Sequence, residues 1–161
     1  MHRIWKGLPL MQRVVLLTAL VAGVQRCAAG ESDDATGLWR TAEGKAVMEV
    51  YRCGEVFCGR ILWLKEPMED GRPVEDRENP VDSLRSRPVL GLRVMEGFAY
   101  DGEREWTGGS IYDPESGDTY SAKMILQDEQ TLELRGYVII PLFGRSEIWT
   151  RVEALPSPAQ E

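Results

Sequence analysis

The chain has 161 residues, of which 19 are lysine or arginine, 26 are acidic and one is histidine, and its formal net charge is −7. An acidic chain lacks the positive surface that binds nucleic-acid phosphates, so the composition excludes DNA and RNA as partners. The length suits one domain rather than two.

Residues 1–30 have the three-part order of a secretory signal peptide. A basic start is followed by the apolar run Val14–Val24 and then by the small residues Ala28, Ala29 and Gly30. The run is too short for a membrane span, which needs about 20 apolar residues, and no later stretch is long enough. We therefore expect no integral membrane span, cleavage near Ala29 or Gly30, and a periplasmic or secreted protein.

Removal of residues 1–30 changes the balance of side chains. His2 and four basic residues leave with the leader while all 26 acidic residues stay, so the net charge falls from −7 to −11. The remaining chain of about 130 residues can still bury one core. Histidine, the commonest general base, is then absent, and no nucleophile or carboxylate pair stands in a catalytic pattern. We therefore predict neither an enzyme nor a bound cofactor.

The remaining chain opens with a polar leader, residues 31–36, and then shows strand patterns. The first strand begins "GLWR", and a turn at Glu43-Gly44 leads into a second strand of alternating side chains. A third strand is predicted from about Glu55 to Leu64. On one face of it we expect Phe57, Ile61 and Trp63.

Cys53 and Cys58 lie between the second and third strands. A zinc site usually takes four ligands, and no histidine or further cysteine pair remains to supply them. A redox motif of the thioredoxin type has two residues between its cysteines rather than four. A hairpin that turns at residues 54–57 would bring the two within disulfide reach, so we predict a structural disulfide and no metal site.

The strand pattern breaks between Lys65 and Gly91, a stretch with four prolines and many charges. A loop of this length in a compact domain is either functional or loosely ordered. One short helical turn is expected from Asp82 to Arg85. The acidic residues here and at "DPESGD" lack the fixed spacing of a calcium loop.

Five further strands are predicted after this loop, and turns are expected at Asp101-Gly102, within residues 113–118 and within residues 128–130. Their sequences are "LRVMEGFAY", "REWTGGSIYDP", "TYSAKMILQ", "TLELRGYVII" and "LFGRSEIWTRV". Eight short strands joined in sequence predict an all-β domain from 37 to 153, an eight-stranded antiparallel up-and-down barrel. A two-sheet sandwich is the rival fold, and residues 154–161 are expected to be a disordered tail.

Gly37-Leu38-Trp39 resembles the Gly-x-Trp with which lipocalins and other calycins begin. In those proteins the tryptophan packs under the barrel against an arginine of the closing strand. The resemblance implies a lipocalin-like barrel in which Arg151 lies over Trp39 as a cation–π contact.

A larger set of motifs resembles one bacterial family, the secreted domain of unknown function 2147. The match runs from Gly37 to Val152. It includes "GLWRT", "CGRILWLKEP", Asp76, Asn79-Pro80, "LRSRPVLG", "WTGGSIYDPESGDTYS", "LRGYV" and "GRSEIWTRV". The resemblance implies a lipocalin-like barrel exported to the bacterial envelope, and it implies no settled activity.

Two readings of the barrel interior stay open. The side chains of Met48, Trp63, Met124, Leu126 and Leu134 could line a site for an apolar ligand, or they could simply fill the barrel. Arg85 and Arg87 could grip an acidic head group with paired hydrogen bonds. They could instead pair with Asp76, Glu78 or Asp82 and hold the loop in place.

The leading hypothesis is a non-enzymatic envelope protein that holds a small, mainly apolar ligand such as a fatty acid or lipid, with the long loop as its lid. The expected ligand-binding residues are Trp63, Arg85, Arg87, Tyr112 and Met124. The alternative is a packed barrel without a ligand that acts as an interaction module for envelope proteins. Nothing in the sequence indicates an oligomeric state.

Overall fold

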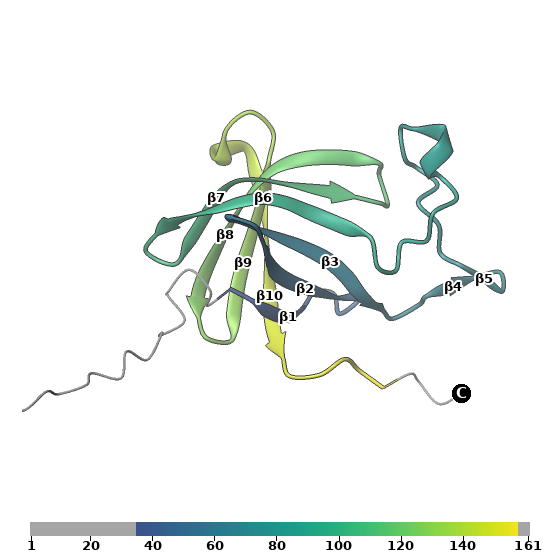
Figure 1. Cartoon of the computed structure of the whole chain (residues 1–161), viewed down its shortest axis with the longest axis horizontal. Helices are drawn as coiled ribbons and strands as arrows, with labels where there is room; N and C mark the ends of the chain where they lie inside the picture. The colour runs from purple at the N-terminus through teal and green to yellow at the C-terminus, as the bar shows by residue number, and fades with distance from the viewer. Residues whose placement is uncertain (1–34, 158–161) are drawn as a thin grey trace, which may run out of the picture.

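The computed structural model describes residues 35–157, which form a closed antiparallel barrel of eight strands (Figure 1). Each strand pairs with the next along the chain, and the last pairs with the first, which confirms the predicted barrel and excludes the sandwich. The strands are β1 (Gly37–Arg40), β2 (Ala46–Cys53), β3 (Val56–Leu64), β6 (Arg93–Gly102), β7 (Glu105–Asp113), β8 (Asp118–Asp128), β9 (Thr131–Tyr137) and β10 (Gly144–Val152). The expected signal peptide, residues 31–34 of the leader and the last four residues of the tail lie outside the described residues.

Alternation of side chains along the strands builds the core inside the barrel. In β8, for example, Ala122, Met124 and Leu126 are buried, whereas the residues between them are not. The largest fully buried side chains are Trp39, Trp106, Trp149, Phe57, Phe98, Met95, Met124 and Leu132. Bulky aromatic groups therefore occupy much of the interior.

Two of these core side chains are seated against glycines of neighbouring strands. A Cβ atom on Gly109 would lie 2.4 Å from the Phe98 ring, and one on Gly59 would lie 2.6 Å from the Met95 sulfur. Both distances are below any real carbon contact, so each glycine leaves the room that its neighbour fills.

The connections alternate between the two ends of the barrel. The turns β2–β3, β6–β7 and β8–β9 lie at one end, here called the base, and the remaining, longer connections lie at the other, the wide end. At the base the Arg151 guanidinium carbon lies 4.1 Å from the centre of the Trp39 ring. Arg151 also donates to the carbonyl oxygens of Thr36 (2.7 Å) and Glu129 (2.6 Å), which ties the first strand to the closing one.

The structure confirms the disulfide between Cys53 and Cys58 but corrects the hairpin around it. Cys53 pairs with Val56 and Cys58 pairs with Tyr51, so the turn contains only Gly54 and Glu55 and the cysteines are diagonal neighbours. The positive φ of Gly54 (76°) allows this tighter turn.

The β6–β7 turn lies two residues later than predicted, at Glu103-Arg104. Both residues have positive φ (51° and 61°), as in the tight hairpin turns whose twist matches that of the strands. Neither residue is a glycine or asparagine, so the sequence did not mark the turn.

A bulge in β3 also reverses one predicted face. Met48 pairs with Ile61 but Val47 pairs with Trp63, so Leu62 has no partner of its own. An extra residue shifts the following side chains to the opposite face. Consequently Leu64 rather than Trp63 packs against the core, and the prediction that Trp63 shares a face with Ile61 is wrong.

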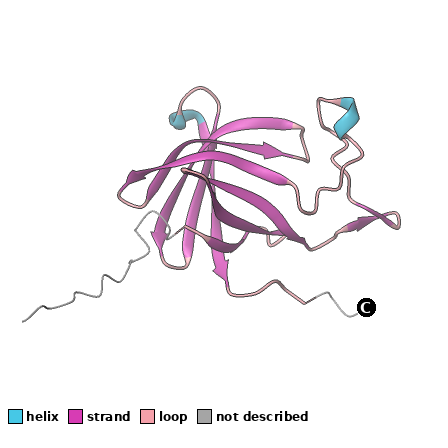
Figure 2. Cartoon of the chain, in the orientation of Figure 1, coloured by secondary structure: helices cyan, strands magenta, loops and turns pink. Residues whose placement is uncertain are grey.

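The segment between β3 and β6 contains short regular elements of its own (Figure 2). It forms a small hairpin, β4 (Met68–Glu69) and β5 (Arg72–Pro73), and the expected helical turn is the 3-10 helix η2 (Asp82–Leu84). Glu75 bridges to Pro88, and Val89 enters the barrel core. This segment is called the long loop below.

The last connection differs from prediction as well. Strand β9 ends at Tyr137, so Val138–Ile140 leave the sheet, and the 3-10 helix η3 (Pro141–Phe143) leads into β10. Ile139 has a positive φ of 70°, which lies outside the β region and interrupts the strand here.

Candidate functional site

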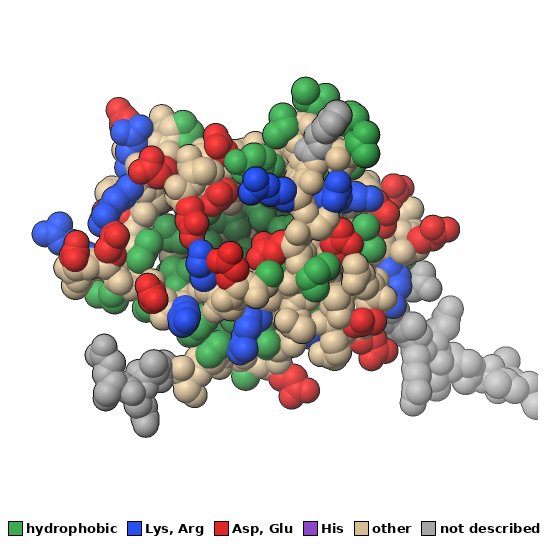
Figure 3. Space-filling model, turned by 180° about the vertical axis from the view of Figure 1, so that it is seen from behind, with side chains coloured by type: hydrophobic (Ala, Val, Ile, Leu, Met, Phe, Trp, Pro, Cys, Tyr) green, Lys and Arg blue, Asp and Glu red, His purple; other side chains and the backbone are tan. Residues whose placement is uncertain are grey.

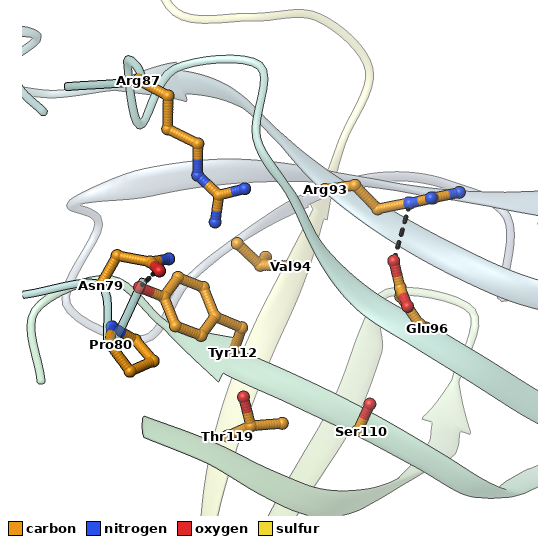
Figure 4. Close-up of a pocket in the computed structure, with 9 residues that line it drawn as sticks. All are labelled: Asn79, Pro80, Arg87, Arg93, Val94, Glu96, Ser110, Tyr112 and Thr119. Atoms are coloured by element: carbon orange, nitrogen blue, oxygen red, sulfur yellow. Dashed lines mark hydrogen bonds and ion pairs between the residues drawn. The ribbon is translucent and has the colours of Figure 1, made fainter. Parts of the chain in front are cut away.

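A cavity of about 300 Å³ lies between the long loop and strands β6, β7 and β8 (Figure 4). Its lining is mostly polar: Asn79, Pro80, Arg87, Arg93, Val94, Glu96, Ser110, Tyr112 and Thr119. The long loop supplies the first three of these residues, and the strands supply the others.

The register of the strands places this cavity on the outer side of the barrel wall. Gly109 pairs with the buried Ala122, and Ile111 pairs with the buried Met95, so both face the lumen. Because side chains alternate along a strand, Ser110 and Tyr112 face outward. The long loop therefore rests against the wall of the barrel at this point, and the cavity is separate from the lumen.

The cavity is held together by Asp76, a fully buried carboxylate of the long loop. Arg87 donates to its Oδ2 atom from Nε (2.8 Å) and Nη2 (2.7 Å), and Asn79 Nδ2 donates to the same oxygen (2.8 Å). The Tyr112 hydroxyl donates to Oδ1 at 2.5 Å. The Asp76 carboxylate thus has the paired and hydrogen-bonded surroundings that a buried charge requires.

Tyr112 connects the barrel wall to this cluster. Its hydroxyl also accepts a hydrogen bond from Asn79 Nδ2 (3.0 Å). Burial raises the pKa of Tyr112 above its ordinary value of 10.0, and the hydrogen bond to Asp76 raises it further, while Asn79 and Arg87 lower it in part. At neutral pH the phenol therefore stays protonated and serves as a hydrogen-bond donor.

Several donors of the cavity remain available to a ligand. Arg87 uses Nε and Nη2 on Asp76, which leaves Nη1, and its guanidinium lies 5.8 Å from the centre of the Tyr112 ring. Within residues 35–157 the hydroxyls of Ser110 and Thr119 have no hydrogen-bond partner, and Figure 4 shows both pointing toward the same space. Arg93 reaches the rim, where it pairs with Glu96 at 2.9 Å.

This arrangement suits an acidic group of a small molecule. A carboxylate or phosphate accepts charge-assisted hydrogen bonds, and arginine is the side chain best shaped to donate them. The Val94 side chain, the Pro80 ring and the Tyr112 ring offer limited apolar contact beside these donors.

Of the five ligand-binding residues expected from the sequence, the structure brings Arg87 and Tyr112 together in this cavity. Arg85 lies on the outside of the long loop, where it pairs with Asp82 (2.9 Å) and donates to the Asn79 carbonyl oxygen (2.8 Å). Met124 is fully buried in the core. Trp63 pairs with Val47 in the β2–β3 hairpin and does not line the cavity. Both arginines thus pair with acidic residues of the long loop.

The sequence predicted Asp76 as a possible partner of the loop arginines, and the structure confirms it for Arg87. It did not select the other residues that complete the site, which are Asn79, Arg93, Glu96, Ser110 and Thr119. The spacing of Asp76 and Asn79 was a usable signal, because an acidic residue three positions before an asparagine in a turn can bond to it. The sequence signal for Ser110 and Thr119 was weaker. Both belong to the polar face of the two strands that meet at Tyr112.

The surface shows a further feature in the view from behind Figure 1. There it is hollowed, with hydrophobic side chains at the floor of the hollow and charged side chains of both signs around it (Figure 3). No group of three or more histidine, cysteine or acidic residues in residues 35–157 could hold a metal ion. Within the same residues there is no helix of the length and hydropathy needed to cross a membrane.

Comparison with known proteins gives the family. A family described as "Uncharacterized protein conserved in bacteria (DUF2147)" matches residues 37–151. Among solved structures, the chain is similar to protein HP1028 of Helicobacter pylori, which is described as belonging to the lipocalin family. The TM-score is 0.65 at 20% sequence identity, over 73% of this chain and 82% of the other, so the likeness concerns the fold.

No curated protein matches the chain. The family match covers most of the chain, and the solved neighbour has the same barrel architecture. The chain therefore belongs to the DUF2147 family of bacterial proteins and folds as a lipocalin-like barrel.

Proposed function

We propose that this protein is an exported, non-enzymatic binding protein that takes a small acidic ligand in the cavity between the long loop and the barrel wall. The observation that carries the proposal is a cavity of about 300 Å³ that is lined by Arg87, whose Nη1 atom is not used on Asp76, and by the unpaired hydroxyls of Ser110 and Thr119. The ligand carries one carboxylate or phosphate group and a short apolar part.

The site is organised before a ligand arrives, which favours binding because less side-chain freedom is lost. Asp76 fixes the orientation of Arg87, and the Tyr112 ring lies beneath the guanidinium. The ligand's acidic group binds Arg87, and the hydroxyls of Ser110 and Thr119 bind polar atoms elsewhere on the ligand. Glu96 compensates Arg93 in the empty site.

The volume and the lining limit the size of the ligand. A cavity of about 300 Å³ is at the lower end for small-molecule sites, and only three of its side chains offer apolar surface. It fits a head group and a short tail rather than a long acyl chain.

The second candidate function is the binding of a fatty acid or lipid, as expected from the sequence. It is favoured by the hollow with a hydrophobic floor and a charged rim seen in Figure 3. A ligand of this kind is mainly apolar, and its tail lies on the hydrophobic floor of that hollow.

Export is supported by the order of residues 1–30 and by the disulfide between Cys53 and Cys58, since disulfides persist in oxidising compartments. Sequencing the N-terminus of the protein recovered from a periplasmic fraction checks this part. A first residue near Glu31 is expected, and an intact Met1 contradicts export by cleavage.

The binding proposal is tested by following backbone amide shifts of the exported protein during titration with butyrate, octanoate and inorganic phosphate. Saturable shifts are expected at Ser110, Tyr112 and Thr119, which pair or neighbour one another in β7 and β8. The double substitution Ser110→Ala and Thr119→Val is expected to weaken binding about tenfold, since two hydrogen bonds are lost.

Ser121→Ala is the matched control, because Ser121 pairs with Ser110 in the sheet but does not line the cavity. It should leave the affinity unchanged. If neither acid nor phosphate shifts these amides, the cavity proposal fails. If native mass spectrometry of the periplasmic protein then finds a stoichiometric lipid, the second candidate stands. A protein without any ligand favours a packed barrel that interacts with other envelope proteins.

A further inference from the structure

The connection between β9 and β10 exposes an unusual concentration of apolar side chains. Ile139 is 89% exposed and Leu142 is 75% exposed, and the neighbouring Val138 and Ile140 are exposed as well. Residues 138–142 are called the apolar loop below. Figure 1 shows this connection at the top of the barrel, at the ends of β9 and β10, so it forms a projection rather than a groove.

The backbone of the apolar loop holds these side chains outward. Ile139 has a φ of 70°, a conformation that a β-branched residue rarely adopts. Arg135 reaches from β9 to the loop, where Nε donates to the Pro141 carbonyl oxygen (2.7 Å), and its Nη1 donates to Ser146 (2.8 Å). The loop is therefore braced in an exposed conformation.

Two arginines lie beside the apolar loop in the sequence and in the sheet. Arg135 and Arg145 flank it, and neither forms an ion pair within residues 35–157. Arg60, Arg77, Arg85, Arg87 and Arg93 pair with carboxylates, whereas Arg40 and Arg72 form no ion pair within the described residues either. In a chain with a net charge of −7, Arg135 and Arg145 place positive charge beside the apolar projection.

From these features we infer that the apolar loop docks on an anionic lipid surface. Its aliphatic side chains enter the boundary between head groups and acyl chains, and Arg145 meets the lipid phosphates, with Arg135 beneath. A second copy of the chain is a poorer occupant. The exposed apolar area is on the order of a few hundred Å², whereas a stable dimer buries about 1,200–2,000 Å². A bilayer needs no complementary pocket.

The inference is independent of the cavity beside Arg87 and is tested without a small-molecule ligand. The exported protein, with its processed N-terminus verified by mass, is sedimented with vesicles of phosphatidylethanolamine with and without phosphatidylglycerol. We expect binding that requires phosphatidylglycerol and weakens as salt is raised. The double substitution Ile139→Asp and Leu142→Asp should reduce it about tenfold or more.

Met68→Asp with Leu90→Asp is the matched control, because it adds the same two charges at other exposed apolar side chains. It should bind vesicles like the wild type. Arg145→Gln should weaken binding to the vesicles that contain phosphatidylglycerol and reduce its dependence on salt. Aspartate tolerates the backbone conformation of Ile139, so the loop variant should unfold at the same temperature as the control.

Three outcomes would overturn the inference. One is the absence of sedimentation with either vesicle, and another is equal sedimentation of the wild type and the loop variant. The third is a dimer in light scattering that the loop substitutions abolish, without vesicle binding, which assigns the loop to a second copy of the chain.

Discussion

Asp76 and Arg87 differ in how far each can reach water, and this difference decides which partner the fold depends on more. The Asp76 side chain is fully buried, whereas about a third of the Arg87 side chain is exposed. A guanidinium that loses its partner can turn toward solvent, but a carboxylate that loses Arg87 stays inside with only Asn79 and Tyr112. An unpaired buried charge is the costlier defect.

We therefore expect Arg87→Leu to lower the free energy of unfolding by about 3–5 kcal/mol, and Asp76→Asn to lower it by about 1–3 kcal/mol. Urea unfolding at neutral pH measures both. Arg85→Leu is the control, because its partner Asp82 is 88% exposed and surface pairs contribute about 0–1 kcal/mol. Equal losses for the two partners would contradict the asymmetry.

Tyr112 makes the stability of the protein depend on pH in alkaline solution. Its pKa is raised in the folded protein, so the folded state holds the phenolic proton more tightly than the unfolded state does. The stability from this group is complete below the unfolded pKa of about 10 and is lost as pH rises through the folded pKa. We expect Tyr112→Phe to be less stable at neutral pH but to lose less stability above pH of about 10. Parallel stability curves for the two proteins would rule this out.

At the scale of single strands, the glycines of the core decide how neighbouring strands approach each other. Gly109 on β7 lies under the Phe98 ring of β6, and no Cβ atom fits between them. Gly136 on β9 also belongs to a lumen-facing row, since it pairs with Ala122, but a Cβ atom there would meet nothing closer than 3.8 Å. The two positions look alike in sequence and differ in structure.

This difference predicts opposite results for one substitution. We expect Gly109→Ala to cost about 1–3 kcal/mol, because an aromatic ring and its strand must shift, whereas Gly136→Ala should cost little or stabilise the protein. Thermal unfolding of both variants checks this. Phe98→Leu combined with Gly109→Ala should recover part of the loss, and a strictly additive double variant would show that the two residues do not couple.

Bulges and turns mark the limit of what the strands reveal in sequence. Alternation predicted the barrel strands because one buried face imposes a period of two. It failed for Trp63, since one extra residue at Leu62 reverses the face. It also misplaced the turn at Glu103-Arg104, because these residues adopt positive φ without the glycine or asparagine that normally signals it.

At the scale of the whole molecule, the barrel closes through its shortest strand. Strand β1 has four residues and shares only three registered pairs with β10. Arg151 strengthens this seam by stacking on Trp39 and by binding backbone carbonyls of both the N-terminal segment and the β8–β9 turn. Gly37 permits the approach, since its φ is 127° and a Cβ atom there would lie 2.7 Å from Arg151.

Arg151→Met should therefore open the barrel at one place. We expect a loss of about 2–3 kcal/mol, from the cation–π contact and the lost hydrogen bonds. Amide hydrogen exchange should accelerate most in β1 and β10 and least in β7 and β8. Uniform acceleration over all strands would mean that Arg151 stabilises the fold globally rather than at the seam.

The candidate site was harder to predict than the fold because it depends on tertiary contacts. Arg87 and Tyr112 were selected from the sequence for their chemistry, and the structure places them together. Their meeting point, Asp76, lies eleven residues before Arg87 and thirty-six before Tyr112. No local sequence pattern indicates which side of the barrel wall a long loop will pack against. The sequence therefore suggested that the long loop is a lid over the mouth of the barrel. In the structure the loop instead encloses a cavity on the outer wall.

The seating of Phe98 over Gly109 has a consequence for how such barrels diversify. Strand number and tilt set the width of a barrel and are hard to change by small steps, whereas the size of one side chain is not. Gly109 and its pairing partner Ala122 have almost no side chain with which to refill the space of the Phe98 ring. Replacing that ring by a small residue would open a cavity beside the other large side chains of the core, so relatives built on one scaffold can differ in lumen capacity without any change of topology.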